Sequence, residues 1–299
     1  MSARVAIAIA SYNHADYVAQ AIRSVHEQTH RDWRLLVIDD GSQDDSAERI
    51  EALRAQLGDE RITFRKRENR GLCRTLNEAL AEADAPFFCY LGSDDYWHPR
   101  KLEMQLTRIG DAAAAYSDCW VVDEAGASRR FSDSTLVPYH GGDIYRDLVF
   151  ARFMPPSPTN LFSTQRVREV GGFDEGSFLE DRDLWLRISR GRRVVYVPEP
   201  LAYYRVHESN VSTANVERMY QAFEYSLDKL LREDPTLRLE EPQLRARNLA
   251  RWAADEYNQH HYGVALRLAR RALFRSPGDR LAWKVSTRAL LKQALEWLR

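Results

Sequence analysis

Two adjacent carboxylates that follow a short apolar run are the residues of this 299-residue chain best suited to chemistry. The run Phe87–Leu91 predicts a strand that is buried on both faces. A glycine and a serine end it, so Asp94 and Asp95 are expected at the carboxyl edge of a sheet, where open α/β sheets bind ligands. Adjacent carboxylates repel one another unless a cation neutralises them, and Mg²⁺ or Mn²⁺ held in this way shares the phosphates of a substrate. The pair therefore indicates a metal–diphosphate site or, more simply, the cap of a helix that begins near Pro99.

The elements that would position these carboxylates alternate between strand and helix. Strands are expected at 5–10, 33–38, 61–66 and 87–91, and helices at 16–28, 44–57 and 72–83. This rhythm predicts an α/β fold, a Rossmann-like and mostly parallel sheet with helices on both faces. Because the strand 33–38 runs into Asp39 and Asp40, a second acid pair is expected at the same edge of the sheet.

The pattern loosens after residue 95 and then becomes helical. Strands are expected at 112–122, 160–163, 194–198 and 202–206, and a helix at 184–190. From about residue 216 the chain is predicted to be helical to its end, so an all-helical appendage follows the α/β part. The short polar side chains of 209–215 mark the expected boundary.

Composition limits the classes of partner. A net charge of −1 and a pI of about 6.7 provide no overall field for nucleic acid, so no nucleic-acid partner is expected. The three cysteines form no CxxC pair, which argues against a disulfide framework or a zinc site and fits a reducing, cytoplasmic compartment. The first apolar run is too short for a signal peptide, and no apolar stretch reaches the length of a membrane span.

The helical tail has two interpretations. Residues 251–275 resemble one helical hairpin of the tetratricopeptide type, a weak signal when it occurs once. Residues 281–299 combine regularly spaced apolar side chains with several Lys and Arg residues. The preferred interpretation is a helix packed on the rest of the protein. The alternative is peripheral contact with anionic lipid at the inner face of the plasma membrane.

Seven short motifs occur in a fixed order along the chain. They are Ser11-Tyr12-Asn13, Asp39-Asp40-Gly41-Ser42, Asn69-Arg70-Gly71, Ser93-Asp94-Asp95, Gly171-Gly172-Phe173-Asp174-Glu175, Glu180-Asp181 with Leu184-Trp185-Leu186-Arg187, and Tyr204-Arg205-Val206-His207. Each is weak alone, but the ordered set resembles family 2 glycosyltransferases of the GT-A fold over roughly residues 2–212. The resemblance implies a catalytic domain at 1–212, with a nucleotide-binding half at about 1–110 and an acceptor-binding half at about 111–212. Residues 213–299 would form the helical region.

The resemblance implies a nucleotide-sugar donor and assigns residues to it. Tyr12 would stack on the donor base, and Asp40 would accept a hydrogen bond from uracil N3–H. An aromatic ring offers a face to a flat base, and a carboxylate can only accept, so it selects a ring with an N–H donor, as uracil and thymine have. The other residues expected around the nucleotide are Ser11, Asn13, Arg70, Asp94 and Arg205.

The resemblance also implies a divalent metal and one general base. Asp95 looks like the direct ligand of Mn²⁺ or Mg²⁺, and Asp94 would contact the ribose or the water shell of the metal. His207 would bind the metal or, with Arg205, the phosphates. Asp181 would take the proton of the acceptor hydroxyl, and the charge of Glu180 beside it would raise the pKa of one of the two. In-line attack assisted by one base predicts inversion at the anomeric carbon.

The function expected from the sequence is thus metal-dependent, inverting glycosyl transfer from a UDP-sugar, or a TDP-sugar, in bacterial cell-surface polysaccharide synthesis. The acceptor would be a hydroxyl of a glycan or a lipid-linked saccharide. A sugar nucleotidyltransferase is one alternative, but it needs a glycine-rich phosphate loop where the sequence has Ser11-Tyr12-Asn13-His14. The other alternative, a catalytically inactive nucleotide- or glycan-binding scaffold, would not need the complete set of carboxylates.

Overall fold

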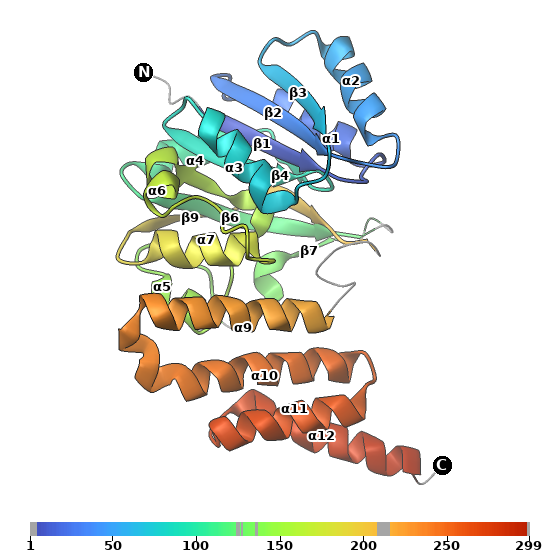
Figure 1. The fold of residues 1–299 in the computed structure, drawn as a ribbon, viewed down its shortest axis with the longest axis vertical. Coiled ribbons are helices and arrows are strands. Elements are labelled where there is room, and N and C mark those ends of the chain that lie inside the picture. Colours follow the sequence, from blue (N-terminus) through green and yellow to red (C-terminus); the bar gives the residue numbers. More distant parts are fainter. Residues whose placement is uncertain (1–4, 124–125, 127, 135–136, 208–215, 298–299) are drawn as a thin grey trace. The chain divides into compact units, whose positions relative to one another are not determined.

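The computed structural model describes residues 5–123, 126, 128–134, 137–207 and 216–297 (Figure 1). The chain forms two compact units. The first comprises Met1–Gly176 and Glu180–His207, and the second comprises Ser177–Leu179 and Glu208–Arg299. The boundary predicted at 212/213 falls within 208–215, outside the described residues.

The first unit is built on one mixed sheet. Its strands are β1 (Val5–Ser11), β2 (Trp33–Asp40), β3 (Ile62–Arg67), β4 (Phe87–Gly92), β5 (Tyr96–Trp97), β6 (Ala114–Val122), β7 (Ser128–Arg130), β8 (Leu161–Ser163) and β9 (Val194–Arg205). The order is β3-β2-β1-β4-β8-β6-β9-β5, with β7 paired to β6. The four strands β3, β2, β1 and β4 are parallel, so the ends of β1, β2 and β4 meet at one edge, as predicted.

Helices flank this sheet, which confirms the predicted α/β architecture. They are α1 (Val18–His26), α2 (Ser46–Leu57), α3 (Leu72–Glu82), α4 (Lys101–Ile109), α5 (Tyr145–Val149), α6 (Thr164–Glu169) and α7 (Glu180–Ser189), with the short 3₁₀ turns η1 (Phe131–Ser134) and η2 (Ser157–Thr159). Two details differ from expectation. The helix predicted near Pro99 begins at Lys101, and α7 begins at Glu180, so the acid pair occupies its first turn instead of preceding it.

The strands predicted at 194–198 and 202–206 are one continuous strand, β9. Proline removes a donor from a strand, and Pro198 and Pro200 therefore suggested a break. The strand continues because its register with β6 shifts at this point, where Ser117 pairs with Val197 but Asp118 pairs with Pro200. A bulge of this kind accommodates residues that cannot join the ladder.

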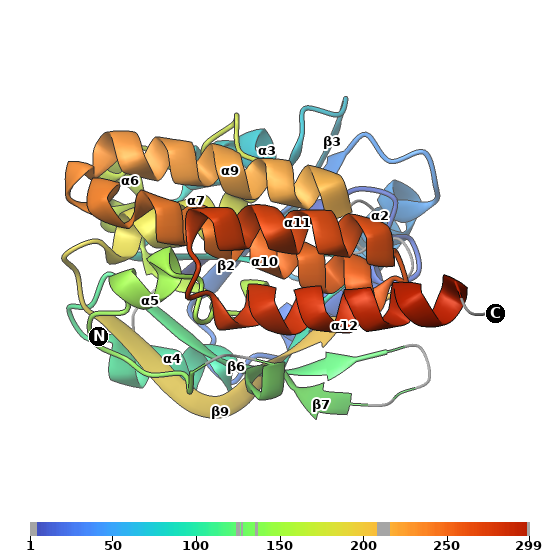
Figure 2. The same ribbon diagram turned by 90° about the horizontal axis from the view of Figure 1, so that it is seen from below.

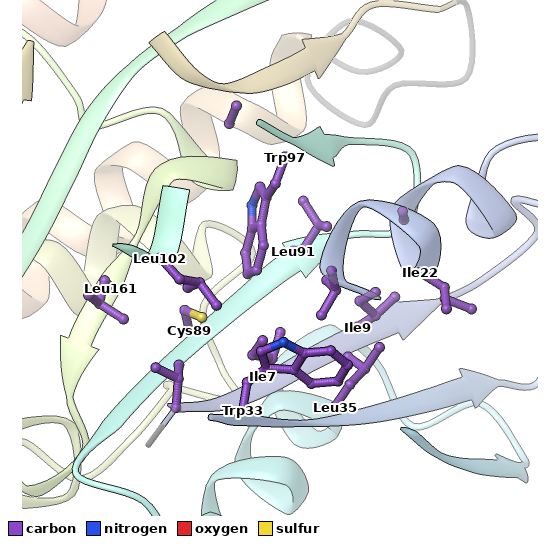
Figure 3. Packing of buried hydrophobic residues seen from close by; sticks show 14 of the residues in the cluster. Ile7, Ile9, Ile22, Trp33, Leu35, Cys89, Leu91, Trp97, Leu102 and Leu161 are labelled. Atoms are coloured by element: carbon purple, nitrogen blue, oxygen red, sulfur yellow. The ribbon is translucent and has the colours of Figure 1, made fainter. Parts of the chain in front are cut away.

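Alternation along the central strands sends side chains to both faces of the sheet. Ile7 and Ile9 of β1 and Cys89 and Leu91 of β4 belong to one buried cluster with residues of α1, including Ile22 (Figure 3). The intervening Phe88 and Tyr90 pack against Phe173 instead, with ring centroids 6.3 and 5.5 Å apart. Because both faces of β4 are covered, its carboxyl end is fixed within the core.

A buried polar side chain continues the pairing of β4 beyond its short neighbour β8. The backbone N–H of Tyr90 donates to Asn160 Oδ1, and Asn160 Nδ2 donates to the carbonyl of Tyr90, both at 2.9 Å. Lys101 Nζ in turn donates to the carbonyl of Asn160 at 2.9 Å, and Gln105 Nε2 donates to that of Thr159 at 2.6 Å. These bonds satisfy buried carbonyls of the 154–160 loop and tie it to α4.

The second unit is helical, as predicted. Its elements are α9 (Val216–Glu233), η3 (Pro235–Glu240), α10 (Glu241–Asn258), α11 (Tyr262–Arg275) and α12 (Arg280–Trp297) (Figure 2). Small residues such as Ala250, Ala269 and Ala289 let α10, α11 and α12 pack closely around one apolar core. The hairpin predicted at 251–275 corresponds to the end of α10 and α11, and its assignment to the tetratricopeptide type stays a prediction. Among the described residues, no helix has the length and hydrophobicity to cross a membrane.

Candidate active site

The two carboxylates after β4 have different surroundings. Asp95 is 4% exposed, and its Oδ1 accepts a hydrogen bond of 2.8 Å from the backbone N–H of Arg205. Burial and the neighbouring charge of Asp94 raise the pKa of Asp95 well above its ordinary value. Asp94 is less buried, and its Oδ2 lies 3.2 Å from Nε2 of His207. Both acids are thus bound to the segment that ends β9, as the order of the motifs suggested.

Asp94, His207 and His14 place three metal-ligating groups together. One ligand atom from each lies within 4.8 Å of those of the other two. His14 follows β1, and its Nδ1 is hydrogen-bonded to Ser93 Oγ at 2.7 Å. Burial lowers the pKa of His14, and the charge of Asp94 offsets part of this effect. The net lowering favours the neutral imidazole that a metal ion requires. Asp95, the ligand expected from the sequence, is not part of this cluster as the described residues define it.

This cluster fits a divalent cation and indicates which kind. Imidazole nitrogens suit transition metals, whereas Mg²⁺ prefers oxygen ligands throughout. Two histidines and a carboxylate thus form a ligand set better suited to a transition-metal ion than to Mg²⁺. The backbone leaves room for these groups because position 92 is glycine: a Cβ on Gly92 would lie 2.7 Å from Asp94 Oδ1. Any side chain there would displace the carboxylate.

Stacked rings hold the end of β9 in place. The ring of Tyr17 stacks on His207 with a centroid distance of 4.9 Å and an interplanar angle of 22°. The guanidinium of Arg205 lies over Tyr17 at 4.8 Å and over Tyr96 at 5.4 Å, and its Nε donates to the carbonyl of Asp94 at 2.9 Å. Cation–π contacts and stacking of this kind fix the orientation of both side chains. Arg205 and His207 therefore both contact Asp94 from the same end of β9.

The residues expected around the base lie at the end of β1. Tyr12 is 47% exposed, so its ring is available as a stacking surface, whereas Ser11 is fully buried. Asn13 has a positive φ of 54° and links two loops, because its N–H donates to Ser42 Oγ at 2.9 Å and its Oδ1 accepts from the N–H of Gln43 at 2.8 Å. Asn13 therefore shapes the loop that presents Tyr12.

Asp40 is engaged by the loop that precedes α3. Its Oδ1 accepts from the Arg67 guanidinium and from the N–H of Arg70 at 2.8 Å, and its Oδ2 accepts from the N–H of Gly71 at 2.9 Å. A carboxylate offers about four lone pairs, so roughly one stays available for a base. The Arg70 side chain itself is exposed. Asp39 organises the following turn, accepting from the N–H and hydroxyl of Ser42 at 3.1 and 2.5 Å.

The acids Glu180 and Asp181 form a coupled pair in the first turn of α7. Burial, followed by the charge of Asp181, raises the pKa of Glu180 to about 8, and burial also raises the pKa of Asp181. Both residues keep part of their surface in contact with solvent. At neutral pH Glu180 is therefore largely protonated, and its raised pKa makes Asp181 a stronger base toward a hydroxyl than an ordinary carboxylate.

Replacing Glu180 by Gln should stabilise the protein, and this stabilisation should grow as the pH rises. The folded-state pKa of about 8 exceeds the ordinary value of 4.5, so the folded protein binds more protons between these values and loses stability as pH rises through them. Glu180→Gln removes this loss. The melting temperatures of variant and wild type should agree near pH 4.5 and differ above pH 8 by at least about 2–4 °C, the effect of ~1 kcal/mol in a domain of this size.

Thermal unfolding across this pH range measures the effect. Glu175→Gln is the control, because Glu175 is exposed and its hydrogen bond with Arg74 lowers its pKa instead of raising it. A Glu180→Gln curve parallel to that of the wild type would show that Glu180 titrates normally.

Two residues of this site were not identified from the sequence. His14 directly follows the Ser11-Tyr12-Asn13 motif, so its place at the end of β1 was a usable signal. Tyr17 gave no signal, because its role depends on stacking against His207, 190 positions later in the chain.

Solved structures share this fold. A mannosyltransferase from Pyrobaculum calidifontis, PcManGT, solved with GDP-Man and Mn²⁺, matches with a TM-score of 0.62 and 18% identity, covering 100% of this chain and 88% of that one. S. aureus TarS 1-349, solved with UDP-GlcNAc, matches with a TM-score of 0.63 and 16% identity over 96% of this chain and 89% of that one. At these identities the likeness concerns the fold.

Sequence comparison identifies the family. An uncharacterized glycosyltransferase of Rickettsia conorii, RC0461, is 28% identical over 214 residues, which is 70% of this chain but only 35% of the length of that protein. The family described as glycosyl transferase family 2 matches residues 6–164, which contain β1 to β8 and both acid pairs of the sheet edge. The chain therefore belongs to glycosyl transferase family 2.

Proposed function

We propose that this protein transfers a sugar from a UDP-sugar to a hydroxyl group with inversion, in a reaction that depends on Mn²⁺. The observation that supports this most is the cluster of His14, Asp94 and His207 at the edge of the sheet. A cation there would hold a diphosphate, the group that a nucleotide-sugar carries. The sugar nucleotidyltransferase alternative finds no support in the family match.

The donor base is the least constrained part of the proposal. Tyr12 offers the stacking face, and one lone pair of Asp40 accepts from the N–H of a ring. Uracil, thymine and guanine all carry such an N–H, and the two structural neighbours were solved with UDP-GlcNAc and with GDP-Man. Our proposal remains a UDP-sugar, with a TDP-sugar as the nearest variant, and Ser11, Asn13 and Arg70 would complete the nucleotide site.

In this proposal, separate groups of residues act on the two sides of the transferred sugar. Asp94, His14 and His207 would hold the metal, which when bound neutralises the charge that develops on the departing diphosphate. Asp95 stays a proposed ligand, although its Oδ1 is already bonded to Arg205. Arg205, fixed over Tyr17, would add positive charge near the phosphates. This arrangement would stabilise the leaving group before the acceptor attacks.

On the other side, Asp181 acts as the base of the proposed mechanism. It takes the proton of the acceptor hydroxyl while the oxygen forms a bond to the anomeric carbon and the bond to the diphosphate breaks. Attack from the face opposite the leaving group inverts the anomeric configuration. Burial raises the pKa of Asp181, which strengthens it as a base.

The acceptor we propose is a glycan or a lipid-linked saccharide of cell-surface polysaccharide synthesis. An acceptor of the second kind is anchored in a bilayer. The enzyme would therefore work in the cytoplasm at the inner face of the plasma membrane, as a peripheral protein.

A thermal-shift screen of nucleoside diphosphates with and without Mn²⁺ tests the donor side. UDP with Mn²⁺ should raise the melting temperature. At a hundredfold excess over its Kd, a ligand increases the free energy of unfolding by ~2.7 kcal/mol. ADP should have no comparable effect, because the ring edge of adenine carries no N–H at this position. Equal stabilisation by ADP, or by UDP without metal, would contradict the proposal. Stabilisation by GDP instead of UDP would change only the proposed donor base, from uracil to guanine. Release of UDP from UDP-sugars in the presence of Mn²⁺ then separates an enzyme from a scaffold.

A further inference from the structure

The last two helices of the chain carry an unusual concentration of positive charge. Residues 262–297, which form α11 and α12, contain eight Lys or Arg and two Asp or Glu, a net charge of +6 in a chain whose total is −1. All eight basic side chains are exposed, whereas Asp279 is buried, where it accepts from the N–H of Ala282 at 2.9 Å. None of the eight forms an ion pair with a side chain that the structure describes. The basic residues are Arg267, Arg270, Arg271, Arg275, Arg280, Lys284, Arg288 and Lys292.

The same two helices expose large apolar side chains. Phe274 is 89% exposed, Trp283 57%, Leu291 61% and Leu290 44%. They make up half of the eight large apolar residues that are exposed in the described parts of the chain. Three of them, Trp283, Leu290 and Leu291, belong to α12, and a group of this kind on one helix differs from the isolated exposed apolar residues of an ordinary protein surface.

Helical spacing places these residues on one side of α12. Trp283, Leu290 and Leu291 are seven and eight residues apart, which brings them onto one stripe. Lys284, Arg288 and Lys292, the basic group of α12, follow one another at intervals of four along its edge. The opposite side of the helix packs into the unit, with Ala282, Val285 and Ala289 buried. Trp283 is held by its indole N–H, which donates to the carbonyl of Pro277 at 2.8 Å.

We propose that the exposed stripe of α12, with the basic residues along its edge, binds the surface of an anionic lipid bilayer. Aromatic and leucine side chains can enter the interfacial region, while long basic side chains reach the phosphates. A protein partner with a neutral apolar surface would not need the exposed basic residues along this stripe, which is why we favour lipid. No described helix crosses a membrane, so the contact would lie on the bilayer. The inference goes beyond the reaction proposed above, because it requires neither donor nor metal.

Flotation of the full chain with vesicles, in the absence of nucleotide and Mn²⁺, tests this proposal. The protein should float with vesicles that contain phosphatidylglycerol and should stay at the bottom with vesicles of phosphatidylcholine alone. Because the attraction is partly electrostatic, high salt should release it. Lys284→Gln/Arg288→Gln/Lys292→Gln should weaken binding by tenfold or more, and Trp283→Ala/Leu291→Ala should weaken it at all salt concentrations.

Leu239→Ala is the matched control, because Leu239 is 93% exposed but lies in η3, outside this surface. This variant should float like the wild type. Far-UV circular dichroism should show that all variants keep their helices. No flotation of the wild type, or flotation that the α12 variants leave unchanged, would overturn the proposal. So would a dimer in light scattering that Trp283→Ala/Leu291→Ala dissociates, since the surface would then bind a second copy. Loss of UDP binding or transfer in the same preparations would concern only the proposed function.

Discussion

Asp181→Asn should reduce sugar transfer by about 10²–10⁴-fold, the usual contribution of a positioned general base. The amide keeps the shape of the side chain and can still accept from the N–H of Arg182, now 2.6 Å from Asp181 Oδ1, but it cannot take a proton. Because the proposed donor site lies elsewhere, at the ends of β1 and β4, the thermal shift caused by UDP and Mn²⁺ should be unchanged. Steady-state kinetics with a saturating UDP-sugar measure the loss in kcat.

Asp111→Asn controls for the removal of one negative charge. Asp111 is exposed and pairs with Arg193 on the surface, so this variant should transfer sugar at the wild-type rate. An Asp181→Asn enzyme that keeps more than about a tenth of the wild-type kcat would exclude Asp181 as the base. Its neighbour Glu180 would then be the first candidate, because the two acids titrate together.

His207→Ala should lower the affinity for Mn²⁺ by at least about 10–100-fold, and kcat/KM by about 10²–10³-fold at subsaturating metal. The imidazole is one of the three groups that meet at the end of β4, and its loss leaves only His14 and Asp94 in that cluster. Activity measured against Mn²⁺ concentration separates a weakened metal site from a damaged fold. Part of the lost activity should return at high Mn²⁺ if the residue is a ligand.

Tyr17→Phe is the control for packing around this histidine. It keeps the ring that stacks on His207 and supports Arg205, and should leave the Mn²⁺ dependence unchanged. If His207→Ala reduces activity without changing the Mn²⁺ concentration needed for half-maximal rate, then His207 serves the phosphates or the fold and not the metal.

The elements that surround the nucleotide could be read from local patterns. Phe87–Gly92 is a strand because five apolar residues precede a glycine, and Ser46–Leu57 begins as a helix after a cluster of acids. The carboxyl edge that collects the acid pairs follows from the parallel order of β1, β2 and β4, which the alternation of strands and helices already implied. Local sequence contains this information because periodicity and caps act within a few residues.

The rest depends on partners far away in the chain. Asp40 was expected to accept a hydrogen bond from the base, and the sequence did not reveal that the N–H groups of Arg70 and Gly71, about 30 residues later, occupy much of its carboxylate. The continuity of β9 through two prolines depends on a shift of register against β6. His14 and His207 meet in one cluster, although they come from the beginning and the end of the sequence of the first unit. Such pairings are specified by tertiary packing and have no signature in a short window of sequence.

The double hydrogen bond between Asn160 and Tyr90 has a consequence for how tightly the site can bind a substrate. A carboxamide supplies one donor and one acceptor, so it substitutes for a missing neighbouring strand and anchors β4 two residues before Gly92. The entropy of immobilising that strand end is therefore lost during folding and not when the nucleotide arrives. An aspartate at 160 would have the same shape but no N–H donor, so the carbonyl of Tyr90 would lose the hydrogen bond that it accepts from Asn160. The precision of the acidic edge thus depends on an amide that touches neither donor nor acceptor.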